Sequence, residues 1–302
     1  MDKILQTIRK TVTSSTISIK LDGEETRRKV KRPGHDEEGE LLPLYGGRDP
    51  VSGQVVVNVP PKKKLEHNGI TIELVGRIEV FGEKSQQNNF ISVVKELSGP
   101  GILVADQMYK FDFSTIKKDF ETYYGINVSL KYLLIAKVIR KVKLNILEER
   151  ELFVRNVQPE PDNDHSVGMS VGVKGELHID FEYARSKYHL NDVIIGKVYF
   201  HDCKMKIKNM EIAILKKETC FQDASATNES DALMQFEVMD GTPVKNEIIP
   251  IRMYLSNLDL TPTYPTINSS FQVRYYLSVD IYNEEGKRFF KQQEITLWRK
   301  EL

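Results

Sequence analysis

The 302-residue sequence has little of several features that would indicate a function class directly. It holds two cysteines, Cys203 and Cys220, which are too few for a disulfide framework and lack the paired spacing of a structural zinc site. Its 43 Lys and Arg residues equal its 43 Asp and Glu residues. Because proteins that grip nucleic acid usually carry a basic excess, we expect no nucleic-acid partner.

Long apolar segments are also missing. No apolar run reaches the about 18 residues that a membrane-spanning helix needs. Residues 1–5 (MDKIL) lack the apolar core of a secretion signal. We therefore expect a soluble, cytosolic protein.

Helical spacing is scarce, and the dominant apolar period is two residues. Apolar and polar side chains alternate over residues 126–138 and 271–281, which is the spacing of half-buried strands. Two short segments fit a helix instead, one at Ile4, Leu5 and Ile8 and one at residues 90–97. Residues 220–231 are small and polar and predict a mobile loop. The overall prediction is an all-β protein.

Three strand-like segments recur in the same order along the chain. Residues 51–55, 109–113 and 126–130 resemble residues 194–198, 251–255 and 271–275, at offsets of 143, 142 and 145. Such a recurrence argues for a duplicated lobe, and each copy suits one immunoglobulin-like β-sandwich. The polar, proline-bearing residues 158–164 (QPEPDND) predict the linker. We expect an N-terminal lobe over residues 1–157 and a C-terminal lobe over residues 165–302.

No segment of the sequence predicts an active site. Residues 168–172 (GMSVG) match the G-x-S-x-G pattern and raise the alternative of an esterase built on Ser170. A nucleophile elbow needs a strand that feeds a helix, whereas strand-like alternation follows Ser170, so we expect no catalytic residue. The six histidines show no metal-ligand spacing, and we expect neither metal nor cofactor. His178 alternates with core-facing neighbours and is predicted to point to solvent or a partner.

Six segments carry a resemblance to a known family. They are residues 186–197 (SKYHLNDVIIGK), 239–244 (MDGTPV), 288–299 (RFFKQQEITLWR), 64–70 (KLEHNGI), 94–97 (VKEL) and 123–128 (YYGINV). The sequence resembles the vacuolar protein sorting-associated protein 26 family, the arrestin-like subunit of the retromer core. The resemblance implies two tandem β-sandwich lobes in an arrestin-like fold. It also implies a non-enzymatic role in cargo recognition and retrieval, in the cytoplasm and at the cytosolic face of endosomes, with indirect membrane association.

The resemblance further implies partners. In the family, the second lobe binds an α-solenoid subunit, vacuolar protein sorting-associated protein 35, through apolar residues just before an Asp-Gly turn. The matching residues here are Val238, Met239, Asp240 and Gly241. The residues alone leave open that Val238 and Met239 are ordinary core. An arrestin-type receptor adaptor outside retromer is the alternative function, and it needs a phosphate-reading cluster of lysines or arginines.

Sorting nexins dock beside the lobe junction in this family, and sorting signals in the cytosolic tails of transmembrane cargo lie against an exposed strand. The matching positions are Val171 and Phe290. Because Phe289 and Phe290 are adjacent, a strand would point them to opposite faces, and an outward ring could receive an extended peptide. The alternative is that both rings are buried at a bend. Residues 201–203 (HDC) replace an aliphatic triplet of the family, which predicts an edge strand or a different register there.

Overall fold

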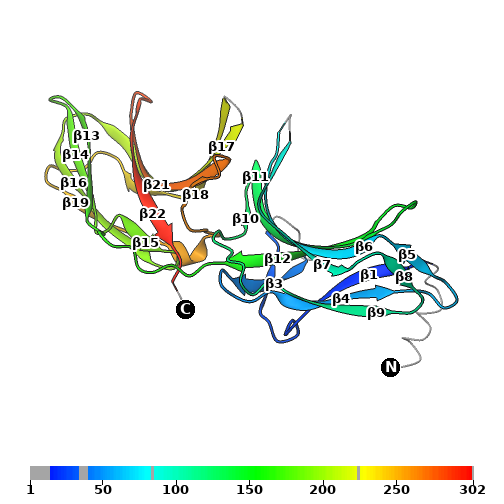
Figure 1. Cartoon of the computed structure of the whole chain (residues 1–302). Helices are drawn as coiled ribbons and strands as arrows, with labels where there is room; N and C mark the ends of the chain where they lie inside the picture. The colour runs from blue at the N-terminus through cyan, green and yellow to red at the C-terminus, as the bar shows by residue number, and fades with distance from the viewer. Residues whose placement is uncertain (1–13, 34–39, 83–84, 223–224, 301–302) are drawn as a thin grey trace. The chain divides into compact units, whose positions relative to one another are not determined.

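The computed structural model describes residues 14–33, 40–82, 85–222 and 225–300, and its regular structure is almost entirely β-strand (Figure 1). These residues form two compact units. The first comprises the described residues up to Tyr124 together with Val128–Asn156, and the second comprises Gly125–Asn127 and the described residues from Val157 onward. The all-β, two-lobe prediction is confirmed. The helix predicted at Ile4, Leu5 and Ile8 lies outside the described residues.

The first unit holds two main sheets, with strand orders β1-β4-β9 and β2-β3-β12-β11-β6-β7, and a small β5-β8 pair. Strand β10 pairs with the first residues of β11 and lies outside the main strand order of the larger sheet. The strands are β1 (Thr16–Leu21), β2 (Lys29–Lys31), β3 (Leu41–Gly46), β4 (Ser52–Asn58), β5 (Leu65–His67), β6 (Gly69–Val80), β7 (Gln86–Ser98), β8 (Gly101–Leu103), β9 (Gln107–Asp112), β10 (Tyr123–Tyr124), β11 (Val128–Ile139) and β12 (Ile146–Arg155).

The second unit stacks two sheets face to face, with strand orders β13-β14-β16-β19 and β15-β22-β21-β17-β18 (Figure 1). Strand β20 pairs with β21, and the 3-10 turn η1 (Leu255–Asn257) follows β19. The strands are β13 (Val167–Val173), β14 (Leu177–Tyr183), β15 (Lys187–His189), β16 (Val193–Cys203), β17 (Ile207–Gln222), β18 (Ser225–Asp240), β19 (Ile248–Tyr254), β20 (Tyr264–Ile267), β21 (Phe271–Asn283) and β22 (Arg288–Trp298). No helix within the described ranges has the length and apolar character to cross a bilayer.

The two units repeat one topology. The order β3-β12-β11-β6-β7 in the first unit matches β15-β22-β21-β17-β18 in the second. In both, the first pair of that order, β3-β12 or β15-β22, is parallel, whereas the other pairs are antiparallel. The three recurring sequence segments fall on β4 and β16, on β9 and β19, and around β11 and β21. The repeat read from the sequence therefore corresponds to a repeated strand order.

A glycine recurs at one position of this repeat. A Cβ at Gly53 of β4 would collide with the carbonyl oxygen of Lys20 on the neighbouring β1. A Cβ at Gly196 of β16 would lie 2.7 Å from the carbonyl oxygen of Glu182 on the neighbouring β14. In both units the glycine lets the next strand approach closely.

The core follows the predicted alternation. On β21, six alternating side chains are fully buried, namely Phe271, Val273, Tyr275, Leu277, Val279 and Ile281. The alternating positions of β11 from Val128 to Val138 are buried in the same way. Ile126, which was expected to begin that apolar face, precedes the strand and is exposed. The period of two thus locates the core, because it sends every second side chain into the sandwich.

The helix predicted at residues 90–97 is wrong, since these residues lie within β7. Two bulges account for the helix-like spacing. In the pairing with β6, Gly76 faces Ile91 and Arg77 faces Asn89, so Phe90 is the extra residue of one bulge, and Leu97 is the extra residue of the other. Each bulge interrupts the alternation of a strand. Gly76 leaves room for Phe90, because a Cβ there would lie 2.7 Å from the Phe90 ring.

The mobile loop predicted at residues 220–231 is also wrong for the part of it that the structure describes. Residues 220–222 end β17 and residues 225–231 begin β18, and the two strands pair from Asn209 and Asp240 up to Gln222 and Ser225. Residues of β18 from Ser225 to Asn228 are all exposed. A strand exposed in this way needs no apolar alternation, so the small polar residues gave no strand signal.

Candidate binding surfaces in the second unit

The apolar residues to which the family resemblance assigns partner binding lie at the end of β18. Strand β18 is the outer strand of its sheet and pairs only with β17 among the described strands. Met210 faces Met239 and Glu211 faces Glu237, so Val238 is the extra residue of a β-bulge. Val238 and Met239 are half-buried, whereas Met210, the partner of Met239 on β17, is fully buried. The bulge turns Val238 away from regular pairing and leaves an apolar strand end partly open to solvent.

A fixed turn follows this strand end. Gly241 has a φ of +88°, which favours glycine, and its amide donates to the carbonyl of Lys208 at 2.7 Å. The Thr242 hydroxyl accepts from the amide of Ile207 at 2.9 Å. Asp240 is exposed at the end of the strand. Because the hydrogen bonds hold the turn to β17, the position of the apolar strand end is fixed before any partner arrives.

Phe290 and Phe289 lie on opposite faces of β22, as predicted. Phe290 is 59% exposed and pairs across the sheet with Asp280, whereas Phe289 is half-buried. Strand β22 pairs with β21 over residues 288–295, but β15 pairs only with its last three residues, 296–298. Among the described strands, the outer edge of β22 beside Phe290 is therefore unpaired. An exposed ring thus stands next to a free strand edge.

Val171 does not share that exposure. Its side chain is 7% exposed and faces the core from β13, the edge strand of the other sheet. Strands β13 and β22 contact one another within this unit. The structure therefore brings β13 and β22 together. A partner could contact the exposed side chain of Phe290, whereas at Val171 it could contact only the backbone at the strand edge.

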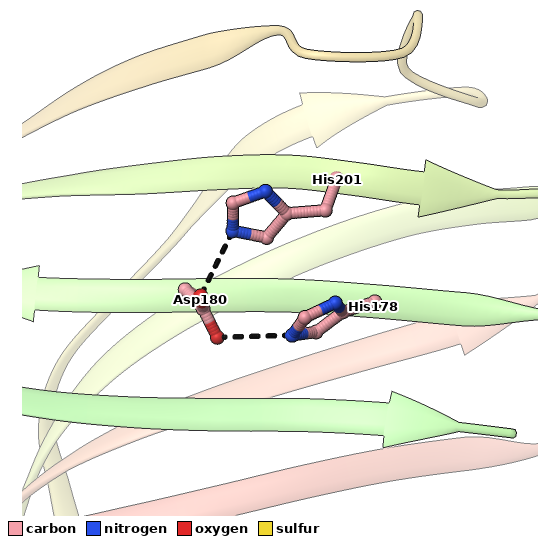
Figure 2. Close-up of side chains that lie close together, drawn as sticks. All are labelled: His178, Asp180 and His201. Atoms are coloured by element: carbon pink, nitrogen blue, oxygen red, sulfur yellow. Dashed lines mark hydrogen bonds and ion pairs between the residues drawn. The ribbon is translucent and has the colours of Figure 1, made fainter.

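Three polar side chains form a cluster on the outer face of β14 and β16. Figure 2 shows the Asp180 carboxylate between the imidazoles of His178 and His201. Nε2 of His201 lies 2.8 Å from Oδ2 of Asp180, and Nε2 of His178 lies 3.4 Å from Oδ1. The expectation that His178 points outward is confirmed, because its side chain is 55% exposed.

Ser170 completes the surroundings of Asp180. It lies on β13, which leads into strand β14 as expected, and its hydroxyl donates to the Asp180 carboxylate. That hydrogen bond, followed in smaller measure by His201 and His178, lowers the pKa of Asp180, against the opposing effect of desolvation. Among the described residues, the hydroxyl donates to the Asp180 carboxylate and forms no hydrogen bond with an imidazole. The hydrogen bond between a serine nucleophile and its base is therefore not seen in this structure.

Sequence reasoning missed this cluster, since no spacing along the chain suggested a group of ligands. The His178-x-Asp180 spacing on a predicted strand was available as a signal, because residues two apart share a face. His201 could not be predicted as a member of the cluster, because a register shift between β14 and β16 brings it beside Asp180. Ile179 faces Phe200, whereas His178 faces Asp202. Of the two expectations for residues 201–203, the changed register is found. Strand β16 as a whole lies between β14 and β19, but β19 pairs only with residues 193–199, so residues 201–203 have an unpaired outer edge among the described strands.

Comparison with known proteins agrees with the fold. Residues 11–286 match the family model described as vacuolar protein sorting-associated protein 26. A protein of that name from Plasmodium falciparum is 41% identical over 287 residues, which cover 95% of this chain and 96% of the relative. The 26B protein of Arabidopsis thaliana is 44% identical over 283 residues, covering 94% and 93%. The protein of Caenorhabditis elegans is 44% identical over 288 residues, covering 95% and 81%. The chain therefore belongs to the vacuolar protein sorting-associated protein 26 family.

Proposed function

We propose that this chain is a retromer subunit that works by docking other polypeptides, without bond-breaking chemistry of its own. Membership of a vacuolar protein sorting family gives the chain a role in vacuolar and endosomal protein sorting. The observation that carries the finer assignment is the apolar, half-exposed end of β18, at Val238 and Met239, in a chain that matches this family. In this proposal, an α-solenoid subunit, vacuolar protein sorting-associated protein 35, binds there.

Two more exposed apolar side chains follow the turn after β18 along the chain. Val244 is 70% exposed and Ile248 at the start of β19 is 55% exposed. When a partner covers exposed apolar side chains, the free energy of binding becomes more favourable by about 25 cal/mol per Å² of apolar surface removed from solvent. A partner helix that lies across β18 would cover Val238 and Met239 together. The fixed Gly241 turn lowers the entropic cost of that binding.

The second proposed surface is the free edge of β22 at Phe290, where a cargo tail binds beside a sorting nexin. A signal of the form aromatic or aliphatic-x-Leu/Met places its two apolar side chains on one face of an extended peptide. A peptide added to the strand edge gains backbone hydrogen bonds, and one of its apolar side chains can contact the Phe290 ring. Val171 takes part only through the backbone of β13, because its side chain is buried.

These interactions would hold the chain at the cytosolic face of endosomes through its partners. In this proposal the membrane contact is indirect: the sorting nexin and the cargo tails supply the attachment. The chain itself contributes the two docking surfaces.

The variant Met239→Asp tests the solenoid surface. Burying an unpaired carboxylate at the centre of an interface costs about 2 kcal/mol or more, so we expect affinity for the solenoid subunit to fall by about 30-fold or more. Met234→Asp is the matched control, because Met234 is half-buried on the same strand. Calorimetry with the purified solenoid subunit gives the affinities, and circular dichroism checks the fold. Unchanged binding by a folded Met239→Asp variant would remove this surface from the proposal.

A further inference from the structure

We propose that His178, Asp180 and His201 form a zinc-binding site on the outer face of the second unit. Each of the three residues offers one ligand atom, and these atoms lie within 4.8 Å of one another. Two imidazole nitrogens and one carboxylate oxygen are a common donor set for Zn²⁺. The side chains are 55%, 37% and 43% exposed, so a metal ion can reach them from solvent.

The local structure holds the three ligands on one surface. His178 and Asp180 are two residues apart on β14 and therefore share its outer face. His201 is the extra residue of the β-bulge on β16, and the bulge directs its ring toward Asp180 (Figure 2). The centres of the two imidazole rings are 4.7 Å apart. Two strands and one bulge thus direct three donors to one point.

Side-chain rotations must bring the three ligand atoms, which lie within 4.8 Å of one another, to the spacing of a zinc site. Bonds of about 2.0–2.2 Å in a tetrahedral site place ligand atoms about 3.3 Å apart. The 3.4 Å between Nε2 of His178 and Oδ1 of Asp180 already meets this value. The 2.8 Å between His201 and Asp180 must widen by about half an ångström. These two contacts use different oxygens of Asp180, so a metal ion that takes one carboxylate oxygen and one nitrogen from each imidazole would replace both contacts.

Neighbouring groups support the ligands. The Ser170 hydroxyl donates to Oδ1 of Asp180, which orients the carboxylate. The ring of Tyr199 stacks on that of His201, with an angle of 12° between the planes. Asp202, which follows His201, is engaged by Lys245 at 3.0 Å and leaves the three-ligand set unchanged. The fourth position of the zinc faces solvent, where water completes the coordination.

The test is calorimetric titration of the full, EDTA-treated chain with ZnCl₂. We expect one saturable equivalent of Zn²⁺. His178→Ala and His201→Ala should each weaken binding by at least about tenfold, since even outer-shell changes cost that much at zinc sites. His165→Ala is the matched control, because His165 is exposed and lies outside the cluster. Cys203→Ser is the second control, because a thiol can bind zinc by itself.

Several results would overturn the proposal. They are the lack of saturable binding by the full chain, binding that both cluster variants retain, and binding that only Cys203→Ser abolishes. Each His variant changes a side chain more than 40% exposed, so the fold should persist, and circular dichroism verifies it. Retained binding in both controls together with loss in both cluster variants would support the site.

Discussion

Arg288 lies across the exposed ring of Phe290, with its guanidinium carbon 4.9 Å from the ring centre. The same guanidinium pairs with Asp280, the residue opposite Phe290 on β21. Removing the Phe290 ring therefore leaves Arg288 anchored by its ion pair. Substitution of Phe290 changes an aromatic contact without freeing a charge.

We expect Phe290→Ala to weaken binding of a cargo-tail peptide, measured by calorimetry with the sorting nexin present. The loss of an aromatic contact beside a strand edge should cost about 1–2 kcal/mol, or about 5- to 30-fold in affinity. Phe81→Ala is the control, because Phe81 is 41% exposed in the first unit. Equal affinity of the wild type and Phe290→Ala would show that the peptide binds elsewhere.

Because β14 and β16 approach closely, we expect any side chain at Gly196 to destabilise the fold. A Cβ there would lie 2.7 Å from the Glu182 carbonyl oxygen and 2.8 Å from the Tyr183 ring. Because a carbonyl within a paired strand cannot move freely, Gly196→Ala should lower the free energy of unfolding by about 1–3 kcal/mol in a urea titration.

Gly168→Ala is the matched control in the same sheet. Its Cβ would lie 3.8 Å from the Phe181 carbonyl oxygen, which is ordinary van der Waals contact. We expect a change within about 0.5 kcal/mol. If both variants unfold at the same urea concentration as the wild type, the close approach at Gly196 is not a constraint on stability.

Glu151 on β12 predicts a pH-dependent stability. Burial raises the pKa of Glu151 from 4.5 to about 7, although Arg32 at 3.7 Å acts in the opposite direction. A group with a raised pKa in the folded state contributes stability that is complete below its unfolded pKa and is lost as the pH rises through the folded pKa. The stability that the protonated Glu151 side chain contributes is therefore lost between about pH 4.5 and about pH 7.

The measurement compares the wild type with Glu151→Gln, which cannot ionise. Between about pH 5 and about pH 8, the unfolding free energy of the wild type should fall by about 1–3 kcal/mol relative to the variant. Glu148→Gln, at an exposed position of the same strand, should follow the wild type. Parallel curves for the wild type and Glu151→Gln would contradict the raised pKa.

The sequence was sufficient for the parts of the fold that depend on regular alternation. The period of two identified the buried faces of β11 and β21, and the recurring segments identified the repeat. The repeated glycine, Gly53 and Gly196, was part of that recurrence. These features are local or repeated, so they are visible without knowledge of which strands pair.

What could not be predicted lies mostly at bulges. Phe90 and Leu97 made β7 look helical, His201 joined a cluster that no spacing suggested, and Val238 left the regular ladder at the end of β18. A bulge is defined by two strands whose pairing slips by one residue, and the partner strand is distant in sequence. The alternation of one strand alone therefore cannot show where its partner shifts the register.

The parallel pairing of β15 with β22 has a consequence for synthesis of the chain. Residues 187–189 hydrogen-bond with residues 296–298, and β22 lies between β15 and β21. While the ribosome is still adding the intervening residues, the edge of β15 that β22 will cover has no partner strand and is exposed to other nascent chains. Pairings between such distant segments form slowly, so the emerging second unit has a period in which a chaperone that shields strand edges would raise the yield of native protein.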